Sequence, residues 1–181
     1  MDKRNIIVAA CLGILLVLTS IYIFLPEGGA KDELLTDAAR RHRVEAMYGD
    51  YKKSFPQVND IPAERALELV KEAKVLFVDV REPREQEVSM LPGAITDKQF
   101  LDNPEAYQDY LIIGYCTISY RSGKLAQKLQ KKGIRMLNLQ GGILAWLHAG
   151  GEVYKNSSPV KRVHVYGKKW DLAPLAYSSV W

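Results

Sequence analysis

The chain has 181 residues, a formal net charge of +4 and 48% hydrophobic residues. It contains no long basic run interleaved with aromatic residues, so nothing in it indicates nucleic-acid binding. Its three histidines show no metal-ligand spacing with other donors, and we expect neither a metal nor another cofactor. Without its first 30 residues, a chain of about 150 residues is long enough for one domain with a real core.

The N-terminal segment predicts a membrane anchor. Residues 6–25 carry no charge, and a helix of that length would span about 30 Å, the thickness of a bilayer core. Lys3 and Arg4 precede the span, which favours a cytoplasmic N-terminus. We therefore expect residues 1–30 to form an uncleaved anchor and linker, with the rest of this single-pass protein outside the cytoplasmic membrane. A cleaved signal peptide and lipidation at Cys11 are the alternatives.

Two segments flank the expected domain. Residues 31–56 predict a polar spacer helix with an incomplete apolar stripe, which we expect to be mostly solvated; a docking helix is the alternative. Residues 154–181 form a C-terminal extension in which residues 163–166 alternate like a short strand and several aromatic residues follow. We expect these aromatics to pack the extension onto the domain. The alternative is a lid or a membrane-facing patch.

Between these segments, residues 57–153 alternate between strand and helix patterns. Strands are predicted at residues 74–80, around 94–95, 111–115 and 135–139. Helices are predicted at residues 62–73, 84–88, 104–110, 122–132 and 143–149. The apolar runs at 75–78 and 111–113 are typical of parallel strands that are buried on both faces. The pattern predicts an α/β domain with a mostly parallel sheet and helices on both faces.

The candidate site lies at the end of the strand 111–115. Cys116 follows the strand directly, and ligands of open α/β sheets bind outside the carboxyl ends of strands. Residues 116–121 can curl so that their backbone N–H groups point at the sulfur, while Arg121 and the next helix add positive potential. Such surroundings favour a nucleophilic thiolate and an anion. The alternative is an inert buried cysteine. Because Cys11 lies in the predicted span, Cys116 has no soluble disulfide partner in the chain.

Four motifs in order resemble a single rhodanese domain over about residues 60–153. They are Asp79-Val80-Arg81-Glu82, Leu91-Pro92-Gly93-Ala94-Ile95, Cys116 with Arg121-Ser122-Gly123, and Leu139-Gln140-Gly141-Gly142-Ile143-Leu144-Ala145-Trp146. The resemblance implies a parallel five-stranded sheet and a thiosulfate sulfurtransferase. Sulfur would pass from a donor such as thiosulfate to cyanide or a thiol through a persulfide.

The resemblance also implies roles for individual residues. Cys116 would carry the persulfide, and Arg121 would bind the anion. The active-site loop would consist of Cys116, Thr117, Ile118, Ser119, Tyr120 and Arg121. Asp79 would tie this loop in place, and Arg81 would be structural or lie near the mouth of the site.

Departures from the family pattern keep other functions open. Ser89-Met90 stands where many members have Gly-His, and bulky Ile118 and Tyr120 narrow the loop, which leaves the natural acceptor open. Phosphatases of the cell-cycle type share the fold, but their loop has one more residue between cysteine and arginine than the four found here. A non-catalytic rhodanese module that binds an unidentified protein partner is the second alternative, although such modules commonly lose the cysteine.

Overall fold

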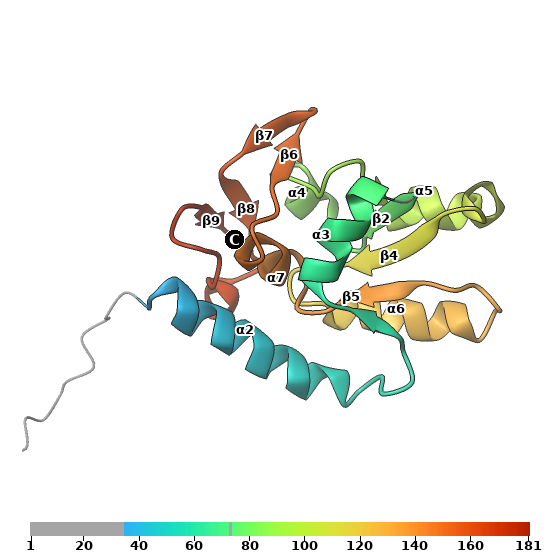
Figure 1. Cartoon of the computed structure of the whole chain (residues 1–181), viewed down its shortest axis with the longest axis horizontal. Coiled ribbons are helices and arrows are strands. Elements are labelled where there is room, and N and C mark those ends of the chain that lie inside the picture. Colours follow the sequence, from blue (N-terminus) through green and yellow to red (C-terminus); the bar gives the residue numbers. More distant parts are fainter. Residues whose placement is uncertain (1–34, 73) are drawn as a thin grey trace, which may run out of the picture. The chain divides into compact units, whose positions relative to one another are not determined.

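The computed structural model describes residues 35–72 and 74–181 (Figure 1). The predicted anchor at residues 6–25 and the linker that follows it lie outside these residues. Among the residues described, no helix is long and apolar enough to cross a membrane.

A five-stranded sheet forms the centre of the domain. Its strands are β1 (Asp60–Ile61), β2 (Val75–Asp79), β3 (Ile95–Thr96), β4 (Leu111–Tyr115) and β5 (Leu137–Leu139). They lie in the order β1-β5-β4-β2-β3, and every neighbouring pair is parallel. The predicted α/β class and parallel five-stranded sheet are therefore confirmed. The strand at β1 was not predicted, because its two residues carry no periodic signal and form a strand only by pairing with Asn138 and Leu139.

Helices cover both faces of the sheet. On one face α3 (Ala63–Glu72) and α7 (Gly142–His148) pack on Phe77, Ile113 and other core residues. On the other face α5 (Asp97–Asp102) and α6 (Tyr120–Gln130) pack on residues such as Leu76 and Ile112. The predicted helix at 104–110 is a short 3₁₀ turn, η1 (Pro104–Tyr107). The unpredicted α5 begins just before it because Thr96 and Gln99 form a capping box.

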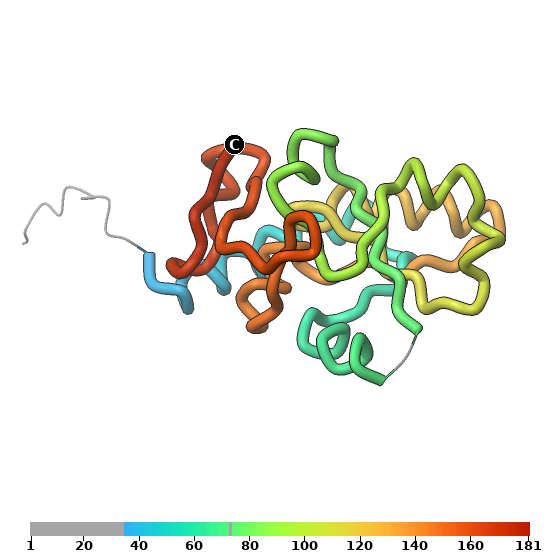
Figure 2. The backbone as a smooth tube through the Cα atoms, turned by 90° about the horizontal axis from the view of Figure 1, so that it is seen from above, coloured from blue at the N-terminus to red at the C-terminus, as the bar shows by residue number. Residues whose placement is uncertain are grey.

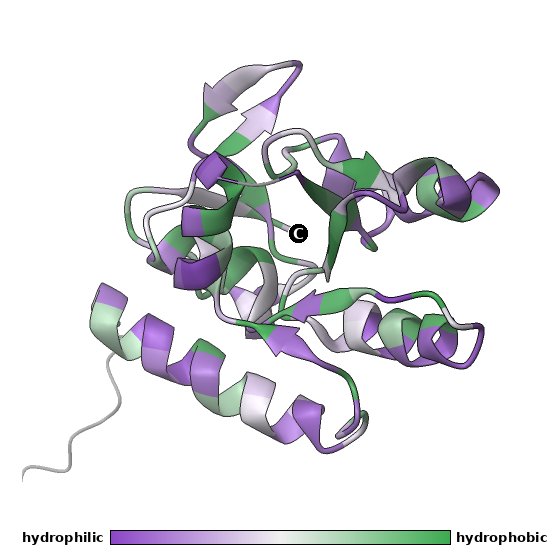
Figure 3. Ribbon diagram, turned by 45° about the vertical axis from the view of Figure 1, so that its right-hand side comes forward, coloured by the Kyte–Doolittle hydropathy of each residue, from purple (hydrophilic) through white to green (hydrophobic). Residues whose placement is uncertain are grey.

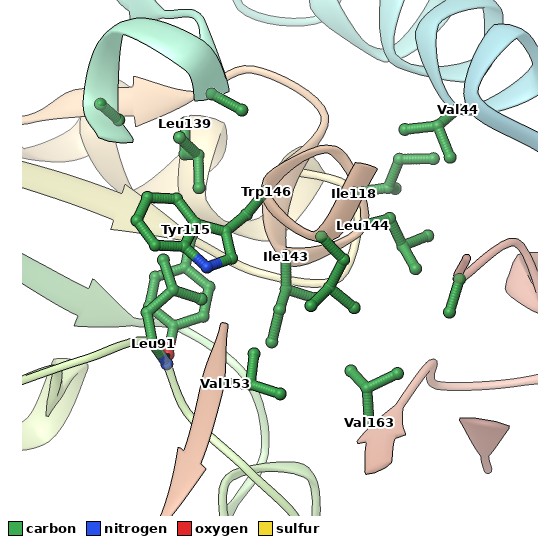
Figure 4. Close-up of a cluster of buried hydrophobic side chains, with 14 of the residues drawn as sticks. Val44, Leu91, Tyr115, Ile118, Leu139, Ile143, Leu144, Trp146, Val153 and Val163 are labelled. Carbon is green, nitrogen blue, oxygen red and sulfur yellow. Dashed lines mark hydrogen bonds between the residues drawn. The ribbon is translucent and has the colours of Figure 1, made fainter. Parts of the chain in front are cut away.

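The core beneath the site is rich in aromatic residues. Trp146 of α7 contacts Phe77 of β2, with ring centroids 5.2 Å apart, and Phe77 contacts Tyr115 edge-on at 6.3 Å. All three side chains are at most 1% exposed. Figure 4 shows Trp146 and Tyr115 among the buried side chains of this core. Burying a large apolar side chain stabilises a fold by about 1.5–3 kcal/mol, so this cluster fixes α7 on the sheet firmly. The end of β4, where Cys116 lies, is fixed with it.

The predicted polar helix is mostly exposed, as expected, and it also docks on the domain through a few buried residues. It is α2 (Asp37–Lys52), whose Val44 and Tyr48 are buried. The Phe55 ring that follows it is fully buried against Gly123 of α6. The ring lies so close to Gly123 that no side chain would fit at that position. Figure 3 shows α2 as a largely hydrophilic helix with a few hydrophobic positions. Those few positions suffice for packing, which the weak apolar stripe did not indicate.

The C-terminal extension also packs on the domain. Its elements are β6 (Val153–Lys155), β7 (Ser158–Val160), β8 (Arg162–His164), the 3₁₀ turn η2 (Lys168–Trp170) and β9 (Ser178–Val180). Its buried core residues are Val163, Val165, Leu172 and Ala173, and the aromatic residues Trp170 and Tyr177 pack against the same core while partly buried. Figures 1 and 2 show the extension beside the start of α2. There the Arg40 guanidinium donates to the carbonyls of Asp171 and Ala173, both at 3.1 Å.

Candidate active site

Cys116 lies where the sequence placed it, directly after β4 at the carboxyl edge of the sheet. Its neighbour β2 ends at the same level, because Asp79 pairs with Tyr115 in the register of the two strands. Cys116 is only 2% exposed and forms no disulfide with any residue that the structure describes. The sulfur is therefore at the ligand-binding edge of an α/β sheet but is shielded from bulk water.

The first turn of α7 orients the loop that follows Cys116. The backbone N–H groups of Ile143 and Leu144 donate to the carbonyls of Cys116 and Thr117 at 2.9 and 3.3 Å. This close approach requires Gly142, since a Cβ there would lie 2.3 Å from the Cys116 carbonyl oxygen. Because these loop carbonyls bind α7, they do not face the site.

The same loop leaves a set of N–H donors free. Ser119 adopts a left-handed conformation (φ 69°) just before α6 begins, and its hydroxyl donates to the Leu139 carbonyl. Within the described part of the chain, the backbone N–H groups of residues 117–122 have no hydrogen-bond acceptor. Free N–H groups at a helix N-terminus form a ready site for an anion. The backbone donors of the loop are therefore available to an anion at the N-terminus of α6.

Arg121 is held by a carboxylate that the sequence analysis missed. Its Nη1 and Nη2 donate to the two carboxylate oxygens of Glu85 at 2.6 and 2.8 Å. Glu85 also accepts from the Thr117 hydroxyl at 3.2 Å and from the backbone N–H of Glu82 at 2.9 Å. It is fully buried in α4 (Pro83–Gln86). The Glu82–Glu85 capping-box spacing could have indicated this helix start, but not the ion pair across 36 positions.

These contacts set the charge of the pair. Burial on its own raises the pKa of Glu85, but the hydrogen bonds from Arg121 and Glu82 and the charges of Arg121 and Arg81 lower it further than burial raises it. Burial lowers the pKa of Arg121, and the contacts with Glu85 and Cys116 raise it more. Both groups are therefore ionised near neutral pH, and the positive charge beside Cys116 is largely compensated by Glu85.

Asp79 and Arg81 lie together one layer below the loop. Arg81 donates through Nε and Nη2 to the Asp79 carboxylate at 2.9 and 2.7 Å, and the Tyr115 hydroxyl donates to it at 2.6 Å. All of these groups are buried. The resemblance gave Asp79 the task of tying the loop. In the structure the Asp79 carboxylate accepts from Arg81 and from Tyr115, the residue before Cys116, and the carboxylate that contacts the loop is Glu85.

A pocket of about 370 Å³ opens onto Cys116. Five of the six predicted loop residues line it: Cys116, Thr117, Ile118, Tyr120 and Arg121. Ser119 points away toward β5. Three further lining residues come from outside the loop, Tyr51 of α2 and Tyr166 and Trp170 of the extension. The aromatic content of the extension was visible in the sequence, but its place beside Cys116 depends on long-range packing. In the described residues no group of three or more metal-ligating side chains comes together.

Known proteins resemble the chain over the part that carries this site. A model of the rhodanese-like domain matches residues 62–149. A protein named sulfurtransferase from Allochromatium vinosum is 34% identical over 98 residues, which are 51% of this chain and 92% of that protein. The uncharacterized protein YqhL of Bacillus subtilis is 38% identical over 84 residues, which are 44% of this chain and 64% of YqhL.

Among solved structures, the thiosulfate sulfurtransferase of Pseudomonas aeruginosa has a similar fold. Its TM-score is 0.50 at 18% identity, over 68% of this chain and 24% of that one. At that identity the likeness concerns the fold alone. The sequence relatives show the family as well as the fold, since the chain covers 92% of the Allochromatium protein at 34% identity. The cysteine at the end of β4, its loop and the glycine pair before α7 thus sit in a chain that belongs to the rhodanese-like domain family.

Proposed function

We propose that the protein is a sulfurtransferase that moves sulfane sulfur through a persulfide on Cys116. The observation that carries the proposal is the loop: the backbone N–H groups of residues 117–122 are free and lie at the N-terminus of α6, directly after the cysteine. Hydrogen-bond donors fixed in that way stabilise a thiolate and the terminal sulfur of a persulfide. Arg121 adds a guanidinium at the same pocket.

The reaction has two transfers, and neither requires an external oxidant. With thiosulfate as donor, the Cys116 thiolate attacks the outer sulfur, the S–S bond of the donor breaks, and sulfite leaves with the electron pair. A thiolate or cyanide then attacks the outer sulfur of the persulfide, and Cys116 leaves as a thiolate. The four residues between Cys116 and Arg121 make a narrower cradle than the phosphatase loop, which favours a sulfur-centred group.

The test is the intact mass of the full-length protein after incubation with thiosulfate. We expect a gain of one sulfur atom, about 32 Da, that cyanide reverses with release of thiocyanate. The Cys116→Ser variant should show no gain and should unfold at the same urea concentration as the wild type. A mass gain that survives this substitution would contradict the proposal. No gain combined with an unreactive Cys116 would favour a binding module.

We further propose that the domain lies outside the cytoplasmic membrane. The support is the uncharged segment 6–25 with Lys3 and Arg4 before it. Fusion of alkaline phosphatase, which is active only outside the cytoplasm, after residue 181 should give an active reporter. A fusion that is active only when the first 30 residues are replaced by a known export signal would contradict this placement.

A further inference from the structure

We propose that this site prefers a small sulfane-sulfur donor with a flat aromatic body over a donor that lacks one, such as methanethiosulfonate or inorganic thiosulfate. The preference deepens the proposed function and rests on it. Three of the four aromatic residues that carry the preference come from the two segments that flank the family match, residues 35–61 and 150–181.

The lining of the pocket is rich in aromatic side chains. Of the residues that line it, Tyr51, Tyr120, Tyr166 and Trp170 are aromatic, and Ile118 is aliphatic. The four aromatic residues form two packed pairs. The ring centroids of Tyr51 and Tyr120 are 5.4 Å apart, and those of Tyr166 and Trp170 are 5.3 Å apart. Tyr120 and Tyr166 are still 41% and 45% exposed. Aromatic faces that stay accessible beside a nucleophile are suited to a planar apolar group.

The positive charge of Arg121 is paired with the negative charge of Glu85. Both terminal nitrogens of Arg121 are already engaged by Glu85, and the guanidinium lies 4.9 Å from the centre of the Tyr166 ring. A dianion that approaches Arg121 also approaches the Glu85 carboxylate behind it, so most of the attraction cancels. The free backbone N–H groups remain available for a single negative charge on the transferred sulfur.

The pocket is also larger than an inorganic oxyanion requires. A volume of about 370 Å³ lies in the range of pockets that enclose organic ligands. An inorganic oxyanion fills a small part of that space and leaves the aromatic walls in contact with water. An aromatic body fills the space and removes those walls from water, which contributes binding free energy only for such a donor.

The aromatic wall of the extension is held in place by specific contacts. Tyr166 has a left-handed backbone (φ 70°), which is unfavourable for a bulky residue. Its N–H donates to Nδ1 of the buried His164 at 3.0 Å, and this bond holds the turn. The next anchor, Arg40, holds the carbonyls of Asp171 and Ala173. A strained residue held over the active-site arginine indicates a constraint beyond folding.

The experiment compares two donors with the same reactive group, benzenethiosulfonate and methanethiosulfonate. In each case the Cys116 thiolate attacks the terminal sulfur, the bond between that sulfur and the sulfonyl sulfur breaks, and a sulfinate leaves with the electron pair. The kcat/KM ratio of the two donors is measured for the full-length protein with a thiol acceptor. It is divided by the rate ratio of the same donors with a free low-molecular-weight thiol, which removes their difference in intrinsic reactivity.

We expect the wild type to favour the aromatic donor about tenfold, the size of effect that aromatic contacts give. Tyr166→Ala and Trp170→Ala should each bring the corrected ratio of the two donors close to one. Tyr166→Phe, which retains the ring, should keep the preference. Tyr110→Ala is the matched control, since Tyr110 is an exposed tyrosine that does not line the pocket.

The outcomes separate the two proposals. If neither of these donors nor thiosulfate transfers sulfur to Cys116, the proposed function fails, and the preference fails with it. If thiosulfate reacts and neither thiosulfonate does, only the preference is overturned. If both donors react and the corrected ratio is near one, only the preference is overturned. A ratio that stays at about tenfold in both alanine variants would show that the extension does not provide the selectivity.

Discussion

At the scale of single residues, Glu85 decides how much positive charge Arg121 presents to a substrate. Replacing it by glutamine keeps a similar shape and removes the negative charge from the pair. We expect Glu85→Gln to lower the KM for thiosulfate about threefold to tenfold, because Arg121 then attracts the dianion without opposition. The KM for monoanionic methanethiosulfonate should fall less. Steady-state kinetics with both donors checks this, and an unchanged KM for thiosulfate would contradict the charge argument.

The pKa of Glu85 also predicts a pH dependence of stability. Because the pKa of this carboxyl is lower in the folded protein than its ordinary value of 4.5, the folded state favours the ionised form. The resulting stabilisation is complete above pH 4.5 and is lost as the pH falls through the folded-state pKa. Urea unfolding of the wild type and of Glu85→Gln should therefore give a difference in unfolding free energy that shrinks on acidification below pH 4.5. A constant difference would exclude the linkage.

At the scale of elements, the junction of α7 with the loop depends on Gly142. A Cβ there would collide with the carbonyls of Cys116 and Thr117 and would meet a left-handed backbone (φ 61°). We expect Gly142→Ala to cost about 2–4 kcal/mol of stability and to slow persulfide formation at least tenfold. Gly150→Ala is the control: φ is 89° and the space around it is open, so only the backbone strain of about 1–2 kcal/mol applies. Equal losses in urea unfolding would contradict the role of the collision.

Most elements near the site were predictable because their signals are local. A short stretch of sequence predicts each of three features: the apolar run before Cys116, the turn at Gly141-Gly142 and the helix after Arg121. The cysteine and its loop could therefore be placed at the edge of a parallel sheet. Family resemblance identified the same loop independently.

The parts that were not predictable depend on contacts between distant residues. Glu85 is one of many charged residues in the sequence, and its role appears only when α4 lies beside the loop. Asp79 was assigned to the loop by resemblance, yet its partners are Arg81 and Tyr115. The packing of α2 rests on a few buried positions, Val44 and Tyr48 among them, too few to give a clear helical periodicity. Tyr51 of α2 lines the pocket only because α2 packs on the domain.

At the scale of the whole molecule, Arg40 joins α2 to the extension. We expect Arg40→Ala to cost about 1–2 kcal/mol, because two carbonyl acceptors lose their donor, and to reduce the preference for an aromatic donor. Arg41→Ala is the matched control on the same helix, since its ion pairs with Glu45 and Glu64 are exposed. Urea unfolding and the donor ratio measure both effects. A donor ratio equally unchanged in both variants would show that this contact does not shape the pocket.

The contact between α2 and the extension also bears on the order of events during synthesis. Arg40 and its carbonyl partners are separated by 131 and 133 positions, and Asp37 accepts a hydrogen bond from the Leu175 N–H across 138 positions. On the ribosome, the sheet, Cys116 and its loop are all made before residues 166 and 170 emerge. The nucleophile can therefore be in place while the part of its aromatic wall that the extension supplies is still missing. The nascent chain would acquire selectivity for the donor later than its nucleophile.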